Sequence, residues 1–324
     1  MLAGHNLYLR RYWQCEETVA EAIRTRLPQR LAVPDDLSVR LDRLLADMRD
    51  ADEAARRQTH WQSVAVALAA RLGFCIISGG PGTGKTTTVV RLLGLLQGLA
   101  LDAGRTPLAI RLAAPTGKAA ARLQDSIRQA VARLDPAVRE HVPTEVSTLH
   151  RLLGPLPDSR HFRHHAGQPL PLDVLVIDEA SMIDLEMMAN LLDALPEHAR
   201  LVLLGDKDQL ASVEAGAVLG DLCRDAEAGW YTPHTREWLE RVSGENLAAS
   251  GLQQDLDGTH PGADPVQELL DAGVGLGRVL QRVLGELQHG PVVRAAQVVP
   301  QLRGPNPLQH SGNRQDVAQR LAHL

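Results

Sequence analysis

The sequence predicts an α/β fold built on a parallel sheet. Four largely apolar runs of strand length are each followed by a polar turn that carries glycine or aspartate, and helix-like segments separate them. The runs are Phe74–Ser78, Ala109–Ala114, Asp173–Ile177 and Leu201–Leu204. Continuously apolar strands are typical of parallel sheets covered on both faces, and such sheets bind ligands at the carboxyl ends of their strands. We therefore expect the chemistry of the chain to lie in these four turns.

The first turn carries the strongest signal in the chain. Its glycines allow successive backbone N–H groups to converge at the start of the helix-like run Thr87–Leu96, where the helix dipole also favours negative charge. Lys85 would reach the β- and γ-phosphates of a nucleotide, and the hydroxyl of Thr86 would ligate Mg²⁺. The expected phosphate and nucleotide contacts are Gly79, Gly80, Pro81, Gly82, Thr83, Gly84, Lys85, Thr86 and Thr87.

Two more turns fit the same site. Asp178 and Glu179 follow the third run as adjacent carboxylates. Beside a phosphate loop, the first carboxylate would complete the Mg²⁺ shell and the second would orient and deprotonate the attacking water. After the fourth run, Gln209 could contact the γ-phosphate as a neutral donor and report whether it is present. Two acids after a strand mean little alone, so this prediction depends on the glycine-rich turn before them.

Two other positions stay open on the residues alone. Gln62 lies on a probable helix, Gln58–Leu72, and could present its amide to an adenine edge, because a carboxamide both donates and accepts. It could equally be a solvated helix glutamine. The turn Pro115-Thr116-Gly117-Lys118 offers a hydroxyl and an ammonium to a phosphate of a nucleotide or a nucleic acid. It could equally be a plain turn between strand and helix.

Composition limits the function classes. The chain has 324 residues, enough for about two domains. Its net charge of -5 means that a nucleic-acid partner would have to bind a local patch. Lysine occurs only at Lys85, Lys118 and Lys207, each in a turn after an apolar run, which suggests anionic contacts there. With no membrane-length apolar run, no signal-peptide core and three widely spaced cysteines, we expect a reducing compartment, the cytoplasm, and no membrane.

Five segments also match, in order, the P-loop and motifs Ia, Ib, II and III of superfamily 1 helicases. They are Gly79–Thr86, Ala113–Leu123, Thr148–Gly154, Asp178–Ser181 and Gly205–Ala217. The long forms of motifs Ia and III are narrower and resemble the RecD family, the alpha subunits of RecBCD (exodeoxyribonuclease V) enzymes. The opening Leu7–Trp13 also resembles that family, so the resemblance covers roughly residues 5 to 255.

The resemblance implies a RecA-like P-loop NTPase domain over residues 58–255, a small helical segment over 1–57 and a poorly defined tail over 256–324. It implies ATP and Mg²⁺ as cofactors, with the following site residues. The catalytic residues would be Lys85, Glu179 and Gln209; the metal ligands Thr86 and Asp178; the adenine contact Gln62; and the DNA contacts Thr116, Lys118 and His150.

The family is an ATP-driven 5′→3′ DNA motor in double-strand-break repair and recombination. It acts on DNA ends beside RecB and RecC subunits, and the nuclease centre belongs to RecB. We find no motifs IV to VI of a second RecA-like domain after Gln254, although Val266–Leu287 could form one amphipathic helix. We therefore expect a fragment, or a reading frame that goes wrong after about Asp255.

Without an arginine from a second domain, worth about 10³–10⁵ in rate, this chain should bind nucleotide weakly, hydrolyse it slowly or not detectably, and not unwind DNA alone. The alternative function is a nucleotide-binding fragment or docking module for RecB-like or RecC-like partners, without helicase activity of its own. An AAA-type ATPase is disfavoured by the run Asp208–Glu214.

Overall fold

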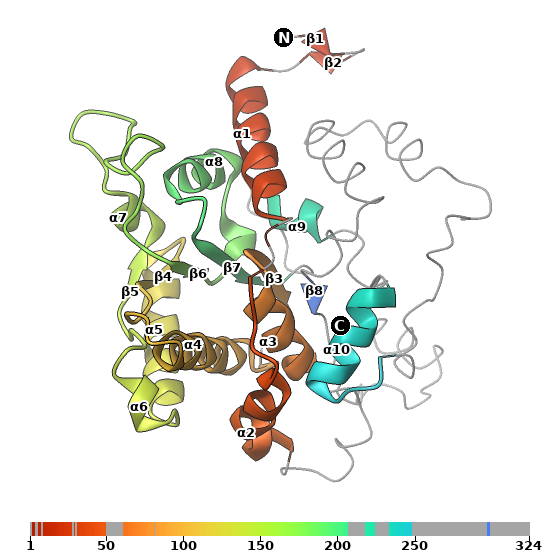
Figure 1. The fold of residues 1–324 in the computed structure, drawn as a ribbon. Coiled ribbons are helices and arrows are strands. Elements are labelled where there is room, and N and C mark those ends of the chain that lie inside the picture. The colour runs from red at the N-terminus through yellow and green to blue at the C-terminus, as the bar shows by residue number, and fades with distance from the viewer. Residues whose placement is uncertain are drawn as a thin grey trace, which may run out of the picture.

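The fold is a six-stranded parallel sheet with helices on both faces (Figure 1). The computed structural model describes residues 2–3, 6–7, 9–27, 29, 31–49, 61–80, 82–206, 218–223, 233–247 and 297–298. The strand order is β5-β4-β6-β7-β3-β8. The strands are β3 (Phe74–Ser78), β4 (Ile110–Ala114), β5 (Val146–Thr148), β6 (Val174–Ile177), β7 (Arg200–Gly205) and β8 (Gln297–Val298). A short antiparallel pair, β1 (Leu2–Ala3) and β2 (Asn6–Leu7), precedes the sheet.

The helices divide between the two faces of the sheet. One face is covered by α2 (Leu37–Arg49), α3 (Trp61–Arg71), α4 (Lys85–Asp102), α5 (Gly117–Val131), α6 (Pro136–Arg139) and α10 (Pro233–Ser243). The other face is covered by α1 (Arg10–Arg26), α7 (Leu149–Leu153), the 3₁₀ turn η2 (Ala180–Met182), α8 (Leu185–Ala194) and α9 (Val218–Leu222). In the described part of the chain, no helix is long and apolar enough to cross a bilayer.

Each central strand contributes to two hydrophobic cores. Along β3, Cys75 and Ile77 lie in the core beneath α3 and α4, whereas Phe74 and Ile76 lie in the core beneath α1 and α8. All five residues of the strand are buried. This alternation explains why the sequence of the strand is continuously apolar, because the side chains on both faces of the sheet are buried away from water. Full burial of a side chain such as Ile77 contributes roughly 1.5–3 kcal/mol.

The predicted N-terminal helices are present and are part of these cores. The helical spacing over Glu17–Leu27 falls in α1, which packs along α8, and that over Leu37–Met48 falls in α2, which contacts α3 and α10. The four predicted strands are confirmed as β3, β4, β6 and β7. The structure adds β5 beside β4 and β8 beside β3. The predicted helix Val266–Leu287 lies outside the described residues, as does the tail 256–324 apart from β8.

Arg26 links α1 to α8, its neighbour on the same face of the sheet. Its side chain is buried, and its guanidinium donates hydrogen bonds to the carbonyl oxygens of Leu195 (2.7 Å) and Pro196 (3.1 Å), which follow the last turn of α8. A third bond reaches the carbonyl of Ala22. Burial lowers the pKa of Arg26 below its ordinary value. A cation at the carboxyl end of a helix also interacts favourably with the helix dipole.

We predict that Arg26→Met lowers the free energy of unfolding by ~1–3 kcal/mol, since it leaves buried carbonyl groups without a donor. Arg24→Met is the matched control on the same helix, because Arg24 forms an ion pair with the exposed Glu21. The control should change stability by less than about 0.5 kcal/mol. Chemical denaturation measures both variants, and equal effects would show that the bonds to the end of α8 add nothing.

Candidate functional site

The loop after β3 has the backbone of a phosphate-binding turn. Gly82 and Gly84 adopt left-handed conformations, with φ of 78° and 79°, which residues with a Cβ adopt only under strain. Gly84 is also the N-cap residue of α4, a helix of 18 residues. A Cβ on Gly84 would lie 2.7 Å from the amide nitrogen of Gln62. The glycines are therefore required by conformation and by close approach, and they leave the amino end of α4 facing the loop.

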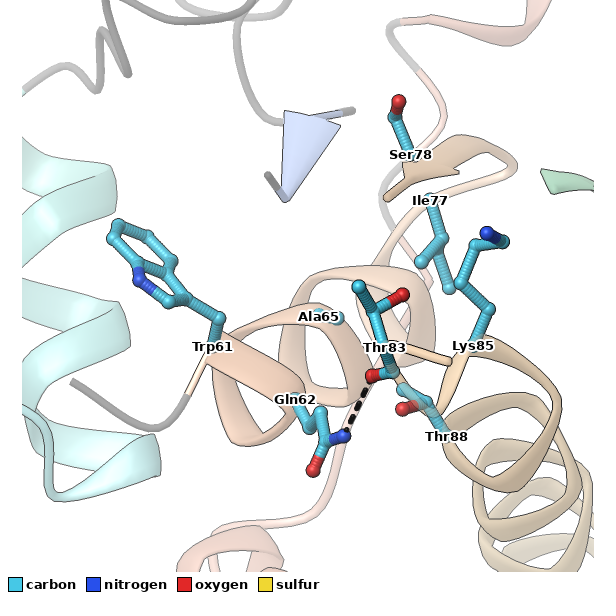
Figure 2. Close-up of a pocket in the computed structure, with 8 residues that line it drawn as sticks. All are labelled: Trp61, Gln62, Ala65, Ile77, Ser78, Thr83, Lys85 and Thr88. Carbon is cyan, nitrogen blue, oxygen red and sulfur yellow. Dashed lines mark hydrogen bonds between the residues drawn. The ribbon is translucent and has the colours of Figure 1, made fainter. Parts of the chain in front are cut away.

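Lys85 lies over this loop. Its ammonium donates hydrogen bonds to the carbonyl oxygens of Gly79 and of Gly80, the latter at 3.0 Å. Figure 2 shows the lysine nitrogen turned toward the end of β3, above Thr83. The hydroxyl of Thr83 donates to the same Gly80 carbonyl at 2.9 Å and so closes the turn. The cation is thus held at the mouth of the loop, where phosphate oxygens would enter.

The first turn of α4 carries the remaining threonines. Thr86 and Thr87 are half-buried, whereas Thr88 is buried and its hydroxyl donates back to the carbonyl of Gly84 at 3.0 Å. Pro81, the remaining expected contact, lies outside the described residues. The structure therefore brings the predicted loop residues together around the start of α4.

Asp178 and Glu179 follow β6, two strands from the loop at the same edge of the sheet. Burial raises the pKa of the Asp178 carboxyl, and the neighbouring charge of Glu179 acts in the same direction. The backbone N–H of Glu179, which donates to Asp178 Oδ1 at 2.9 Å, and the cation of Lys85 both oppose that rise. The loop and the acidic pair therefore lie at the same carboxyl end of the sheet, with β7 between the strands that precede them.

Carboxylate and hydroxyl oxygens are the hard donors that Mg²⁺ prefers, and Thr86 and Asp178 offer one of each at the carboxyl end of this sheet. Asp178 is half-buried and its carboxyl accepts a hydrogen bond from the backbone N–H of Glu179, which leaves oxygen lone pairs that a divalent cation could use. The donor set therefore fits magnesium. Gln209, the predicted γ-phosphate contact, and Lys207 both lie outside the described residues.

A pocket opens beside the loop at the start of α3. It is lined by Trp61, Gln62, Ala65, Ile77, Ser78, Thr83, Lys85 and Thr88 (Figure 2). Gln62 donates from its amide nitrogen to the carbonyl of Thr83 at 3.1 Å, so it is tied to the loop and is not a freely solvated helix residue. Its amide oxygen is not used in that bond. Sequence reasoning missed Trp61 in this pocket, although a tryptophan directly before Gln62 was a visible signal.

The predicted DNA contacts follow β4 and β5, at the carboxyl ends of the two strands farthest from β3 and the phosphate loop. Thr116 is the N-cap of α5, and its hydroxyl accepts from the backbone N–H of Ala119 at 3.2 Å, so this hydroxyl has a structural use. Lys118, in the first turn of α5, is exposed. His150, in α7 after the edge strand β5, is exposed and meets Phe162 edge to face at 5.9 Å. These residues are separated from the phosphate loop by β6 and β7.

Comparison with known proteins agrees with this geometry. The family model described as an AAA domain matches residues 62–215. The chain is 49% identical over 225 residues to the RecBCD enzyme subunit RecD of Mycolicibacterium smegmatis, covering 68% of this chain and 38% of that protein. It is 45% identical over 227 residues to the RecD subunit of Haemophilus influenzae, covering 67% of this chain and 34% of that protein.

One further relative is a helicase by name. The ATP-dependent RecD2 DNA helicase of Deinococcus radiodurans is 41% identical over 151 residues, which is 47% of this chain and 18% of that protein. Among solved structures, a complex titled as two coordinating Pif1 helicases unwinding forked double-stranded DNA has a TM-score of 0.26 at 19% identity, covering 61% of this chain and 39% of that one.

The chain spans little more than a third of the length of the first RecD relatives, so the comparison concerns one region of those proteins. The residues that the family model matches contain the phosphate loop, the acidic pair and strands β3 to β7. Over two thirds of its length, this chain is a homologue of the RecD subunit of RecBCD enzymes.

Proposed function

We propose that this chain carries the ATP-binding motor domain of a RecD-type DNA helicase. In this proposal ATP hydrolysis drives 5′→3′ translocation and unwinding at DNA ends, beside RecB-like and RecC-like subunits, in the repair and recombination of double-strand breaks. One observation supports it above the others: the loop that carries Lys85 and the acidic pair Asp178–Glu179 follow β3 and β6, which both pair in register with β7, so they lie at the same carboxyl end of the parallel sheet. A role on chromosomal DNA ends places the protein in the cytoplasm.

In the proposed mechanism, the loop backbone and Lys85 bind the phosphates, and Thr86 and Asp178 would hold Mg²⁺. The metal would neutralise charge on the phosphates when bound. Glu179, next to Asp178 in the chain, would orient the attacking water and accept its proton. Gln62 donates to the Thr83 carbonyl, and its amide oxygen, which that bond leaves unused, would contact the base.

DNA would bind at the carboxyl ends of β4 and β5, in the half of the sheet away from the phosphate loop. Lys118 is the exposed cation there, and His150 is an exposed ring that can stack or donate. These polar side chains and the phosphate loop lie at the same carboxyl end of one sheet, which supports a motor with separate nucleotide and DNA sites.

We predict that Lys85→Ala reduces binding of a fluorescent ATP analogue with Mg²⁺ below detection while the fold is retained. The reason is that the variant removes the cation that lies over the loop. Circular dichroism checks the fold, and Lys118→Ala serves as the matched control, since it alters the other strand-end lysine. Equal nucleotide affinity in wild type and Lys85→Ala would remove Lys85 from the site.

The reciprocal experiment tests the DNA side. Lys118→Ala should weaken binding of single-stranded DNA and reduce the slope of log affinity against log salt concentration by about 0.7, the value expected for one lost phosphate contact. Lys85→Ala should leave that slope unchanged in the absence of nucleotide. Fluorescence anisotropy across a salt series measures both slopes, and an unaltered slope in Lys118→Ala would exclude this contact.

The variant Asp178→Asn tests whether the folded protein holds this carboxyl where its charge is unfavourable without a metal ion. Because burial raises the pKa of Asp178 in the folded protein, ionisation of this carboxyl costs stability above the folded-state pKa. The asparagine variant should therefore unfold at a higher temperature than wild type near pH 7 without nucleotide. The gain should vanish below the ordinary value of 3.8, where the carboxyl is protonated in both states.

The same variant should lose the Mg²⁺ dependence of nucleotide binding. Asp125→Asn is the control, since Asp125 is an exposed carboxylate near Arg128 and should alter neither property. Thermal unfolding from pH 3 to 8, with and without Mg²⁺ and nucleotide, measures the outcome. Destabilisation of Asp178→Asn at pH 7, or an unchanged response to Mg²⁺, would contradict the assignment.

A further inference from the structure

Ser181 follows the acidic pair in an unusual turn. Glu179, just before it, has a left-handed backbone, with φ of 53° and ψ of 40°, which is uncommon for a residue with a side chain. This conformation ends β6 abruptly and turns the chain into η2. As a result Glu179 stays half-buried at the edge of the sheet, while Ala180 and Ser181 are turned inward and Ser181 is 6% exposed.

The turn rests on the carboxyl end of β7. A Cβ built on Gly205, the last residue of that strand, would lie 3.5 Å from the backbone nitrogen of Ser181 and 3.7 Å from that of Ala180. Gly205 also accepts a hydrogen bond from the backbone N–H of Gly79, the first residue of the phosphate loop, at 3.1 Å. Ser181 therefore packs against the end of β7. This strand lies between β6, which precedes the acidic pair, and β3, which precedes the phosphate loop.

The hydroxyl of Ser181 is buried and has no hydrogen-bond partner among the described residues. A buried donor without a partner is destabilising, and alanine at the same place would avoid that cost. Ser243 in α10 shows the usual arrangement in this chain: it is also buried, and its hydroxyl donates to the carbonyl of Leu239 at 2.7 Å. Because Ser181 follows Glu179 by only two residues in the chain, its unpaired hydroxyl calls for a partner in another state of the site.

We propose that Ser181 is a positioning residue of the nucleotide site. Its hydroxyl makes a hydrogen bond that exists only when a magnesium nucleoside triphosphate is bound, to a phosphate oxygen or to a water held by the phosphates. A serine hydroxyl suits either partner, because it can donate and accept. This inference rests on the proposed function, since it requires the nucleotide to enter between the phosphate loop and the acidic pair.

The test separates stability from binding. Ser181→Ala should leave the melting temperature of the nucleotide-free protein unchanged or higher, because no hydrogen bond is lost in that state. The same variant should bind a non-hydrolysable ATP analogue with Mg²⁺ about three- to tenfold more weakly, and its melting temperature should rise less on addition of the analogue. Isothermal titration calorimetry and thermal unfolding of the full chain give both quantities.

Ser243→Ala is the matched control and should behave in the opposite way, with a lower melting temperature and an unchanged affinity for the analogue. If Ser181→Ala does not fold, Ser181→Cys replaces it, because the thiol keeps the volume and forms only weak hydrogen bonds. An affinity equal to wild type in the serine variant overturns this inference and leaves the proposed function standing. Absence of nucleotide binding by the wild-type chain overturns the proposed function and this inference with it.

Discussion

The parallel ladder that joins β3, β7 and β6 is the constraint on which the site depends. Ser78 pairs in register with Gly205, and Leu203 of the same strand pairs with Ile177. The phosphate loop and the acidic pair therefore leave the same end of the sheet with one strand between them, β6 ending two residues before β3 along the register of β7. At the usual spacing of strands they emerge about 10 Å apart, a distance suited to a triphosphate and its metal. A slip in either register would separate the two halves of the site.

Much of this arrangement could be predicted from the sequence, because the strands are buried on both faces. The run Phe74–Ser78 coincides with β3, and the glycines after it stand where left-handed backbone is required. By contrast, β5 has three half-buried residues and gives almost no periodic signal. The strand order was not predictable either, since local sequence does not say which strands pair across the sheet.

The site residues, like the strands, could be predicted only in part from the sequence. The local sequence was sufficient to place Lys85 and Asp178 after strands, because each follows an apolar run of strand length within a recognisable motif. The role of Gln62 was undecidable from spacing, and the bond to the Thr83 carbonyl comes from the packing of α3 against the loop. The capping use of Thr116 likewise depends on the geometry of its helix, which the motif does not encode.

Gln97 shows a buried polar side chain with an evident structural role elsewhere in the fold. Gln97 in α4 is fully buried, yet its amide donates to the carbonyls of Leu108 and His141 and accepts from the Leu108 N–H. It thereby ties the approach to β4 to the chain that follows α6. Such satisfied groups hold connections in place without a ligand. They are the background against which an unsatisfied group near the carboxylates stands out.

The bonds of Lys85 to its own loop have a consequence for selectivity. The ammonium already donates to two carbonyl groups, at Gly79 and Gly80, so only its third N–H is open to an anion unless those bonds are exchanged. A singly charged ion offers little in exchange. A polyphosphate offers several oxygens and more than one charge, and the loop can therefore exclude common small anions of the cell by competition from its own backbone.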